Sequence, residues 1–418
     1  MEITDVSAYA LSSPIDPPQE RPFYGGIRTL RKRDVVLVAV ELSDGEVGYA
    51  PAGASSSAMR EHFEGATQEG FAKLLSGRVS EALSGRTLSE PSDAHESIEG
   101  LGLPEPLCSQ AIGAVDVALY DLEGKRRGMP IYELLATEPD ARGSVTTDLP
   151  LYASAGMYME PEGYVAQART IDDLGFFGYK YRPGIGPDAD RKTARLLADA
   201  IGCELMIDAH TWWKLGDRSY ASETVRELAD GFSDHGVYWL EEPVPPADHA
   251  GYRALADRTA VPLAGGESEE TPDGLCALAD TGAVSFLQGD VRHHRGFTGC
   301  WEAATHCAGT DVTFVPHNFG TWLGLVANAH LVAAAPETEL LEYPVFENDP
   351  ALTPHLAGRS DPGMYPFTLA FDLLEDDLSI VDGRFRVPDG PGLGVTVDES
   401  VIEEYPFVEG SWTEFRYD

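Results

Sequence analysis

Apolar runs and helical patterns alternate along the chain from Leu149 onward. Eight short runs there read as strands, and the segments between them carry apolar residues at helical spacing. This alternation is typical of a parallel sheet, either closed into a (β/α) barrel or open and doubly wound. The count of eight favours the barrel. The runs are LPLYAS, GYKYRP, CELMIDAH, VYWLEEP, VPLAGGE, VSFLQGD, VTFVPH and LLEYP.

The flanking segments have different patterns. The stretch VVLVAVELSDGEVGYA alternates around Asp44-Gly45, a dipeptide typical of hairpin turns, and helical spacing follows over 60–75 and 79–83. A long helix of small and apolar residues is predicted after Pro106, ending near residue 128. The tail from about Pro366 reads as irregular structure with short strands that return to the amino-terminal region.

Polar and charged side chains stand at the carboxyl end of nearly every run, which also favours the barrel. Active sites of (β/α) barrels lie at that end of the strands. These side chains would then converge on one mouth although they span more than a third of the chain. From the second run to the eighth they are Lys180 and Arg182, Asp208 and His210, Glu241, Glu267, Asp290, His317 and Glu342.

Three of these side chains predict a metal site. Asp208, Glu241 and Glu267 end three consecutive runs, one βα repeat of roughly 30 residues apart. Three neighbouring carboxylates offer hard oxygen ligands and leave room for water and substrate, which suits Mg²⁺. Any single acidic residue in so acidic a chain is most simply a solvated surface group. The shared position at the ends of adjacent strands favours the metal site.

Asp290 and His317 end the next two runs. A carboxylate that is hydrogen-bonded to one imidazole nitrogen raises the basicity of the other, which makes a general base near neutral pH. A lone histidine here could equally be structural, but the acidic partner one strand away favours catalysis. The other histidines mostly lack such a partner: His293 and His294 lie in a polar loop, and His306 and His330 fall in helical segments, where a structural role is expected.

Composition narrows the possible partners. The 418 residues include 30 Lys and Arg against 69 Asp and Glu, a formal net charge of −39, which excludes a basic nucleic-acid groove and a polybasic membrane anchor. This acidity favours adaptation to high salt over an ordinary acidic surface. Five cysteines without CxxC spacing indicate neither a disulfide framework nor a zinc site. Without a recognisable leader or membrane-spanning run, we expect a cytoplasmic protein.

Several motifs together resemble one protein family. WLEEPVPP, AGGE and VPHNFGT at three strand ends, the hairpin VVLVAVELSDGEVGYA and the helix QAIGAVDVALYDLEGKRRGMPIYELL resemble the enolase superfamily and, within it, the mandelate racemase group. The resemblance implies a modified (β/α)7β TIM-type barrel with an α+β capping domain formed from both termini. The expected regions are an amino-terminal capping domain over 1–125, the barrel with the active site over 126–365, and a segment over 366–418 that returns to the cap.

The resemblance also implies roles for individual residues. Glu342 would hydrogen-bond the substrate carboxylate as it becomes an enediolate, and Glu242 would brace Glu241. Cap loops over 18–33 and 50–57 would close over the site, with Tyr24 and Arg28 as possible substrate contacts. The remaining implied roles are Mg²⁺ ligation by Asp208, Glu241 and Glu267, and acid/base chemistry by Asp290 and His317.

The second strand departs from the family pattern. The family commonly carries Lys-x-Lys there, and the second lysine is a base on the face opposite the histidine, whereas this chain has Lys180 followed by Arg182. Arginine keeps its proton at neutral pH and is a poor base, but it suits a bidentate grip on a carboxylate. Lys180 would contact the substrate carboxylate. His210, in an Asp-x-His arrangement resembling sugar-acid dehydratases, is either a second acid/base group or a neighbour of the metal.

The leading hypothesis is a Mg²⁺-dependent lyase, a dehydratase that removes the proton alpha to the carboxylate of a hydroxylated sugar acid and expels the β-hydroxyl. In it His317 or His210 is the base. The alternative is an isomerase of the same group, a racemase, epimerase or cycloisomerase, with Lys180 as second base. A third reading is a barrel that only binds a ligand or a partner. We expect a small hydroxy-acid substrate, a homo-oligomer, and neither nucleic acid nor a membrane as partner.

Overall fold

The computed structural model describes residues 1–53, 57–64, 67–138, 141 and 145–418. Each of the eight predicted runs forms one strand of a parallel sheet. The strands pair in sequence order from β4 to β10, and β11 pairs with β4. Because the last strand returns to the first, the fold is the predicted barrel and not an open doubly wound sheet. The strands are β4 (Asp148–Met157), β5 (Gly178–Arg182), β6 (Glu204–Asp208), β7 (Trp239–Glu241), β8 (Leu263–Gly265), β9 (Phe286–Leu287), β10 (Thr313–Phe314) and β11 (Leu341–Pro344).

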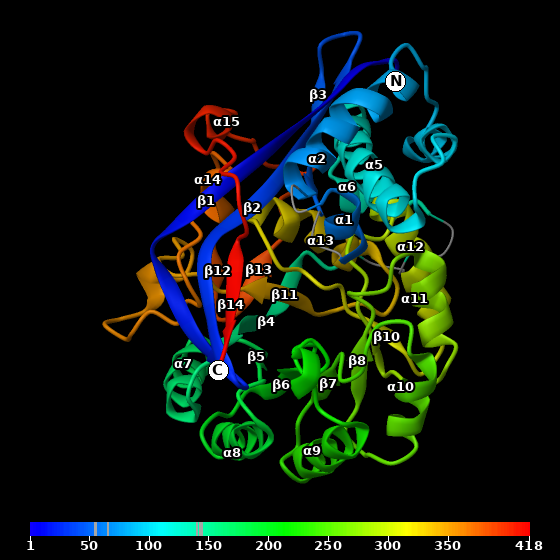
Figure 1. The fold of residues 1–418 in the computed structure, drawn as a ribbon. Helices are drawn as coiled ribbons and strands as arrows, with labels where there is room; N and C mark the ends of the chain where they lie inside the picture. The colour runs from blue at the N-terminus through cyan, green and yellow to red at the C-terminus, as the bar shows by residue number, and fades with distance from the viewer. Residues whose placement is uncertain (54–56, 65–66, 139–140, 142–144) are drawn as a thin grey trace.

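One helix connects each barrel strand to the next, which gives the predicted (β/α)7β order. The helices α7 to α11 lie outside the ring of strands (Figure 1). Several begin with proline in the first turn, where its missing N–H costs nothing. The helices are α7 (Pro161–Asp173), α8 (Pro187–Ala198), α9 (Ser222–Asp234), α10 (His249–Ala256), α11 (Pro272–Ala279), α12 (Gly296–Cys307) and α13 (Trp322–Ala334).

The cap is built on a long antiparallel hairpin of β1 (Ile3–Phe23) and β2 (Gly26–Leu42). A second turn, at the predicted Asp44-Gly45, connects β2 to β3 (Val47–Ala52), which pairs with β2. The expectation of a loop over 18–33 is wrong, because these residues are strands except for the turn at Tyr24 and Gly25. Figure 1 shows that this hairpin extends from near the amino terminus of the chain to near its carboxyl terminus.

The helices of the cap follow β3. The helical stretch predicted over 60–75 is divided between α1 and α2, and the long predicted helix is α5, which packs between β3 and α12. Gly128 ends α5 at a φ of 66°, a left-handed conformation that glycine adopts without steric cost. The elements are α1 (Ser57–His62), α2 (Thr67–Leu74), the π-helical η1 (Leu75–Val79), α3 (Ser80–Leu83), the 3₁₀-helical η2 (Pro91–Ala94), α4 (His95–Glu99), α5 (Glu105–Arg127) and α6 (Ile131–Leu135).

The carboxyl-terminal residues contribute to both sheets. β14 (Thr413–Tyr417) pairs with β2 in the cap, whereas β12 (Ile380–Val381) and β13 (Arg384–Arg386) form a hairpin that extends antiparallel from β4. The domain limits 1–125, 126–365 and 366–418 stay a prediction. Short helical segments complete the chain: η3 (Gly216–Arg218), η4 (Thr353–His355), α14 (Leu369–Asp372) and α15 (Val401–Glu404).

One apolar core joins the cap to the barrel. Its buried side chains come from β1, β2 and α5 of the cap and from the strands and helices of the barrel. All five cysteines are free thiols, three of them buried. Among the described helices, none has the length and apolar character needed to cross a bilayer.

Candidate active site

Three carboxylates meet at the carboxyl ends of adjacent barrel strands. Asp208 ends β6, Glu241 ends β7 and Glu267 follows β8, and one oxygen atom of each lies within 4.8 Å of the others. Glu267 follows Gly266, whose φ of 130° disfavours residues other than glycine. A Cβ added to Gly266 would lie 2.8 Å from Leu275, so the backbone path that leads to Glu267 requires glycine. The structure therefore brings together the three predicted metal ligands.

Two cations of β5 lie against these acids. The Nζ atom of Lys180 is 2.7 Å from a carboxylate oxygen of Glu241 and 2.7 Å from one of Glu342. Arg182 Nε lies 3.0 Å from Asp208 Oδ2, and the same guanidinium donates to Ser154 Oγ. We call the eight side chains Lys180, Arg182, Asp208, Glu241, Glu267, Asp290, His317 and Glu342 the mouth cluster.

Charges within the mouth cluster shift its pKa values. Burial lowers the pKa of Lys180, but Glu241 and Glu342 outweigh burial and raise it above its usual value. Burial raises the pKa of Glu241 to about 7, and the charges of Asp208 and Glu342 add to the rise while Lys180 opposes it. Lys180 is thus held in its charged form, while the crowded carboxylates need further positive charge.

The three carboxylates fit a divalent metal ion. Asp208 Oδ2 is buried, and among the described residues no donor is oriented to hydrogen-bond it, although Arg182 lies close. An unsatisfied buried carboxylate oxygen is costly, and a cation relieves that cost. All three donors are hard oxygen atoms, the ligand type that Mg²⁺ prefers. The site can therefore hold a metal, with Asp208, Glu241 and Glu267 as its ligands.

The predicted histidine pair is formed beside the three carboxylates. His317 Nδ1 lies 2.9 Å from Asp290 Oδ2, and His317 Nε2 lies 3.0 Å from Glu267 Oε2. Burial lowers the pKa of His317, but the charge of Glu267 and the hydrogen bond with Asp290 outweigh burial and raise it to about 9. Asp290 orients the ring so that its second nitrogen faces the candidate metal ligands.

Asp290 has a second partner that sequence reasoning missed. Arg292 donates from Nε to Asp290 Oδ1 at 3.0 Å and from Nη2 to Oδ2 at 2.5 Å, and Asn328 also donates to Oδ1. Burial raises the pKa of Asp290, but Arg292 and His317 outweigh burial and hold it well below its usual value. The carboxylate is therefore kept charged and fixed in orientation beneath His317.

Other polar side chains also hold the mouth cluster in place. Glu241 accepts hydrogen bonds from Trp239 Nε1 and Gln288 Nε2, and Glu342 accepts one from the backbone of Asn318. Gln288 lies two residues before Asp290, a spacing that places both side chains on one face of an extended segment. This spacing could have indicated from the sequence that Gln288 belongs to the site.

Three site predictions concern neighbours of these carboxylates. His210 Nδ1 lies 2.7 Å from Asp208 Oδ1, so its ring contacts a candidate metal ligand. Glu242 accepts hydrogen bonds from the backbone and hydroxyl of Ser268, next to Glu267, and its expected bracing of Glu241 stays a prediction. Lys180 and other cations outweigh burial and lower the pKa of Glu342, so its role as hydrogen-bond donor to a substrate, which needs the protonated carboxyl group, stays a prediction.

The two predicted cap contacts occupy different positions. Tyr24, at the hairpin turn, is 38% exposed, and its backbone donates to the oxygen of Gly184 in the loop after β5. Arg28 is buried, and its guanidinium carbon lies 5.2 Å from the centre of the Tyr158 ring, just after β4. In the second expected loop, over 50–57, residues 54–56 lie outside the described part of the chain.

His293 lies close to the His317–Asp290 pair. Its ring centre lies 6.4 Å from that of His317, and a Cβ on Gly53 of the cap would lie 2.3 Å from it. His294 and His330 are buried and bonded to backbone atoms, as a structural role requires. His306 pairs with Asp280.

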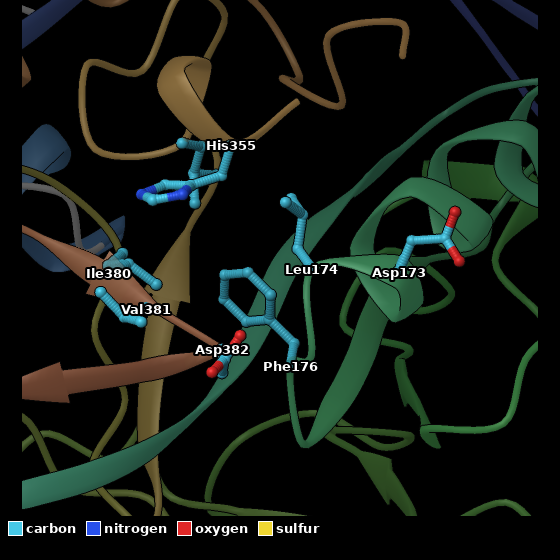
Figure 2. Close-up of a pocket in the computed structure, with 8 residues that line it drawn as sticks. Asp173, Leu174, Phe176, His355, Ile380, Val381 and Asp382 are labelled. Atoms are coloured by element: carbon cyan, nitrogen blue, oxygen red, sulfur yellow. The ribbon is translucent and has the colours of Figure 1, made fainter. Parts of the chain in front are cut away.

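A separate cavity lies at the opposite end of the barrel. It has a volume of about 180 Å³ and lies between the α7–β5 connection, η4 and the β12–β13 hairpin (Figure 2). Its lining includes Phe176, His355 and Val381, and it contains no member of the mouth cluster. Phe176 precedes the start of β5, and the β12–β13 hairpin pairs with the start of β4, so the cavity lies at the amino-terminal ends of these strands and is not the predicted active site.

Comparison with known proteins identifies the family. Residues 163–401 match a family described as enolase C-terminal domain-like. Residues 12–136 match the mandelate racemase / muconate lactonizing enzyme N-terminal domain. The chain belongs to the enolase superfamily. Its two matches confirm the resemblance to the mandelate racemase group.

Relatives of this enolase-superfamily chain are enzymes. A D-galactarolactone cycloisomerase from Agrobacterium fabrum is 27% identical over 97% of this chain and 99% of the relative. A D-xylonate dehydratase from Haloferax volcanii is 26% identical over 75% of this chain and 74% of the relative. The crystal structure of a member of the enolase superfamily from Polaromonas sp. JS666 matches with a TM-score of 0.78 at 26% identity, covering 98% of this chain and 99% of that one.

Proposed function

We propose that this protein is a metal-dependent lyase that eliminates water from a hydroxylated sugar acid. The observation that carries the proposal is that the mouth offers His317 as a base but holds Lys180, the candidate second base, between two carboxylates. His317 presents Nε2 beside Glu267, whereas Lys180 is held between Glu241 and Glu342 at 2.7 Å from each. Racemisation requires a base on each face of the substrate, but elimination can proceed with one.

The steps follow from this arrangement. His317 Nε2 takes the proton from C2, alpha to the carboxylate, and Asp290 stabilises the resulting imidazolium at Nδ1. When bound at the three carboxylates, Mg²⁺ supplies electrophilic stabilisation of the negative charge that develops on the substrate carboxylate. The C3–O bond then breaks, and the imidazolium returns its proton to the departing oxygen to form water. The enol product takes a proton at C3 from solvent and becomes a 2-keto-3-deoxy acid.

His210 and Arg182 support this chemistry from beside Asp208. Both contact Asp208, His210 at Oδ1 and Arg182 at Oδ2. We assign them to holding Asp208 in place. Lys180 donates toward the substrate carboxylate, and the cluster as a whole excludes water from the reacting face.

A panel assay tests the proposal. Aldonic and aldaric acids are incubated with the enzyme and Mg²⁺ in molar KCl, and 2-keto product is detected with semicarbazide. We expect one stereochemical series to react and EDTA to stop the reaction. No product from any acid would contradict the proposal.

Cycloisomerisation is the second candidate, because the D-galactarolactone cycloisomerase aligns with nearly the whole chain. Cycloisomerisation differs from dehydration only in the oxygen that leaves C3. In cycloisomerisation this is the ring oxygen of a lactone, and in dehydration it is a hydroxyl. The same assay with the corresponding lactones separates the two candidates. A lactone that reacts at least about tenfold faster than its open-chain acid would favour cycloisomerisation.

A further inference from the structure

Two arginines of the cap lie among aromatic rings and have no acidic partner among the described residues. Arg28 and Arg33, both on β2, form what we call the cap arginine pair. Arg28 is 6% exposed and donates from Nε to Thr413 Oγ1. Arg33 is half-buried, and its Nε atom is buried with no acceptor. Buried charges are almost always paired. With 69 acidic side chains in the chain, the lack of a partner is not due to scarcity.

Aromatic rings hold both guanidinium groups in place. Trp412 contacts both, with its ring centre 4.7 Å from Arg28 Cζ and 4.8 Å from Arg33 Cζ. Phe319 lies 5.5 Å from Arg33 Cζ. Rings stabilise a cation through its flat face and leave the N–H edge free to bind an anion.

A shared ring contact links the pair to the mouth cluster. Phe319, which contacts Arg33, also lies 4.5 Å from Arg182 Cζ and follows His317 by two residues. Burial lowers the pKa of Arg28, and the charges of Arg33 and Arg182 lower it further. Like charges thus gather on the cap side of the mouth, opposite in sign to the carboxylates of β6, β7 and β8.

We propose that the cap arginine pair binds a second anionic group of the substrate, at the end remote from the carboxylate held by the mouth cluster. The preferred substrate is therefore a sugar diacid or its monolactone, and not a monocarboxylic sugar acid. This inference rests on the proposed function, since it assumes that a sugar acid occupies the mouth.

Binding to an inactive variant tests the inference directly. His317→Asn, loaded with Mg²⁺, is titrated calorimetrically with matched pairs of acids, galactarate against galactonate and glucarate against gluconate. Members of each pair differ only in whether C6 is a carboxylate or an alcohol. For at least one pair we expect the diacid to bind on the order of 10- to 100-fold more tightly. Equal affinities within every pair would overturn the inference.

Substitutions test whether Arg33 causes the preference for the diacid. Adding Arg33→Gln to His317→Asn should reduce the ratio of diacid to monoacid affinity to near one, and adding Arg33→Lys should retain part of that ratio. Arg31→Gln is the control, because Arg31 lies on the same strand but is exposed and paired with Glu414. If the arginines only hold Trp412 in position, Arg33→Gln will lower the affinities for the diacid and the monoacid equally. The ratio of affinities will then be unchanged, which contradicts the proposal.

Turnover by the unsubstituted enzyme separates the two proposals. A protein that binds diacids preferentially but converts none of the acids would overturn the proposed function and retain the anion site. Conversion of monoacids, with equal affinities within each pair, would retain the function and overturn the anion site.

Discussion

The mouth cluster and the cap arginine pair differ in what surrounds their positive charges. In the mouth, Lys180 and Arg182 each lie within 3.0 Å of a carboxylate. In the cap, Arg28 and Arg33 face aromatic rings instead. The first arrangement keeps its own charges balanced and holds the groups of the reaction in place. The arrangement in the cap leaves the charges of Arg28 and Arg33 available to an anion from outside the chain.

This difference assigns separate tasks to the two regions. The barrel carries the acids and the histidine that any substrate of the proposed reaction needs, so substitutions there should affect all acids equally. The cap carries charge that only some acids can use. Substitutions in the barrel therefore test the reaction, and substitutions in the cap test the choice of substrate.

The largest effect is expected from Glu267→Gln. Removing one charge from the three carboxylates weakens metal binding, and turnover should fall on the order of 10,000-fold for every acid that reacts. Calorimetry with Mg²⁺ and kcat/KM measure the two losses. Glu270→Gln, an exposed change three residues later, is the control and should leave both unchanged. Full metal affinity in Glu267→Gln would remove Glu267 from the metal site.

The next effect distinguishes the two histidines. His317→Asn removes the base, and kcat should fall on the order of 1,000-fold with Mg²⁺ affinity retained. His210→Asn removes a partner of Asp208, so it should mainly weaken Mg²⁺ binding, about tenfold or more. Titrating activity against Mg²⁺ concentration separates the two. The reverse pattern would make His210 the base.

A smaller effect concerns the acidic surface. Screening by salt reduces repulsion among the acids that give a net charge of −39, so the melting temperature should rise by roughly 5 to 10 °C between 0.1 and 2 M KCl. Differential scanning calorimetry measures it. Adaptation to high salt stays a prediction until then, and a melting temperature indifferent to KCl would count against it.

The smallest effect comes from a buried acid without a cation. Asp349 accepts a hydrogen bond from Tyr343 at 2.6 Å, and burial raises its pKa to about 7. Because the folded state holds this proton more tightly than the unfolded chain, stability from this group is present at pH 4 and lost toward pH 7. In the unsubstituted protein this group should lower the unfolding free energy by about 3 kcal/mol between pH 4 and pH 7, and Asp349→Asn should abolish that decrease, as measured by urea unfolding. An unchanged pH dependence would show that Asp349 titrates normally.

The barrel was predictable because its sequence repeats one physical pattern. Nearly every apolar run is largely buried and has a polar residue at or near its carboxyl end, so the repeat alone places Asp208, Glu241 and Glu267 at neighbouring strand ends, where the structure has them. The partners of these residues were less predictable. Arg292 folds back onto Asp290 two residues away, and no periodicity distinguishes that contact from an exposed arginine.

The cap was harder to predict. β1 contains four prolines between Pro14 and Pro22, which are typical of a loop, but an edge strand tolerates them because its outer N–H groups need no partner. The positions of Arg33 and His293 depend on how the cap closes on the barrel. Residues as distant as Trp412 and Gly53 define their surroundings, so a local pattern could not reveal them.

The most direct test of the proposed reaction is proton NMR of the reacting acid in heavy water, with the unsubstituted enzyme and with His317→Asn. The account predicts loss of the C2 proton together with a new, partly deuterated C3 methylene of the 2-keto product, and neither change in His317→Asn. Exchange of the C2 proton for deuterium with the C3 hydroxyl retained, or full activity in His317→Asn, would contradict it.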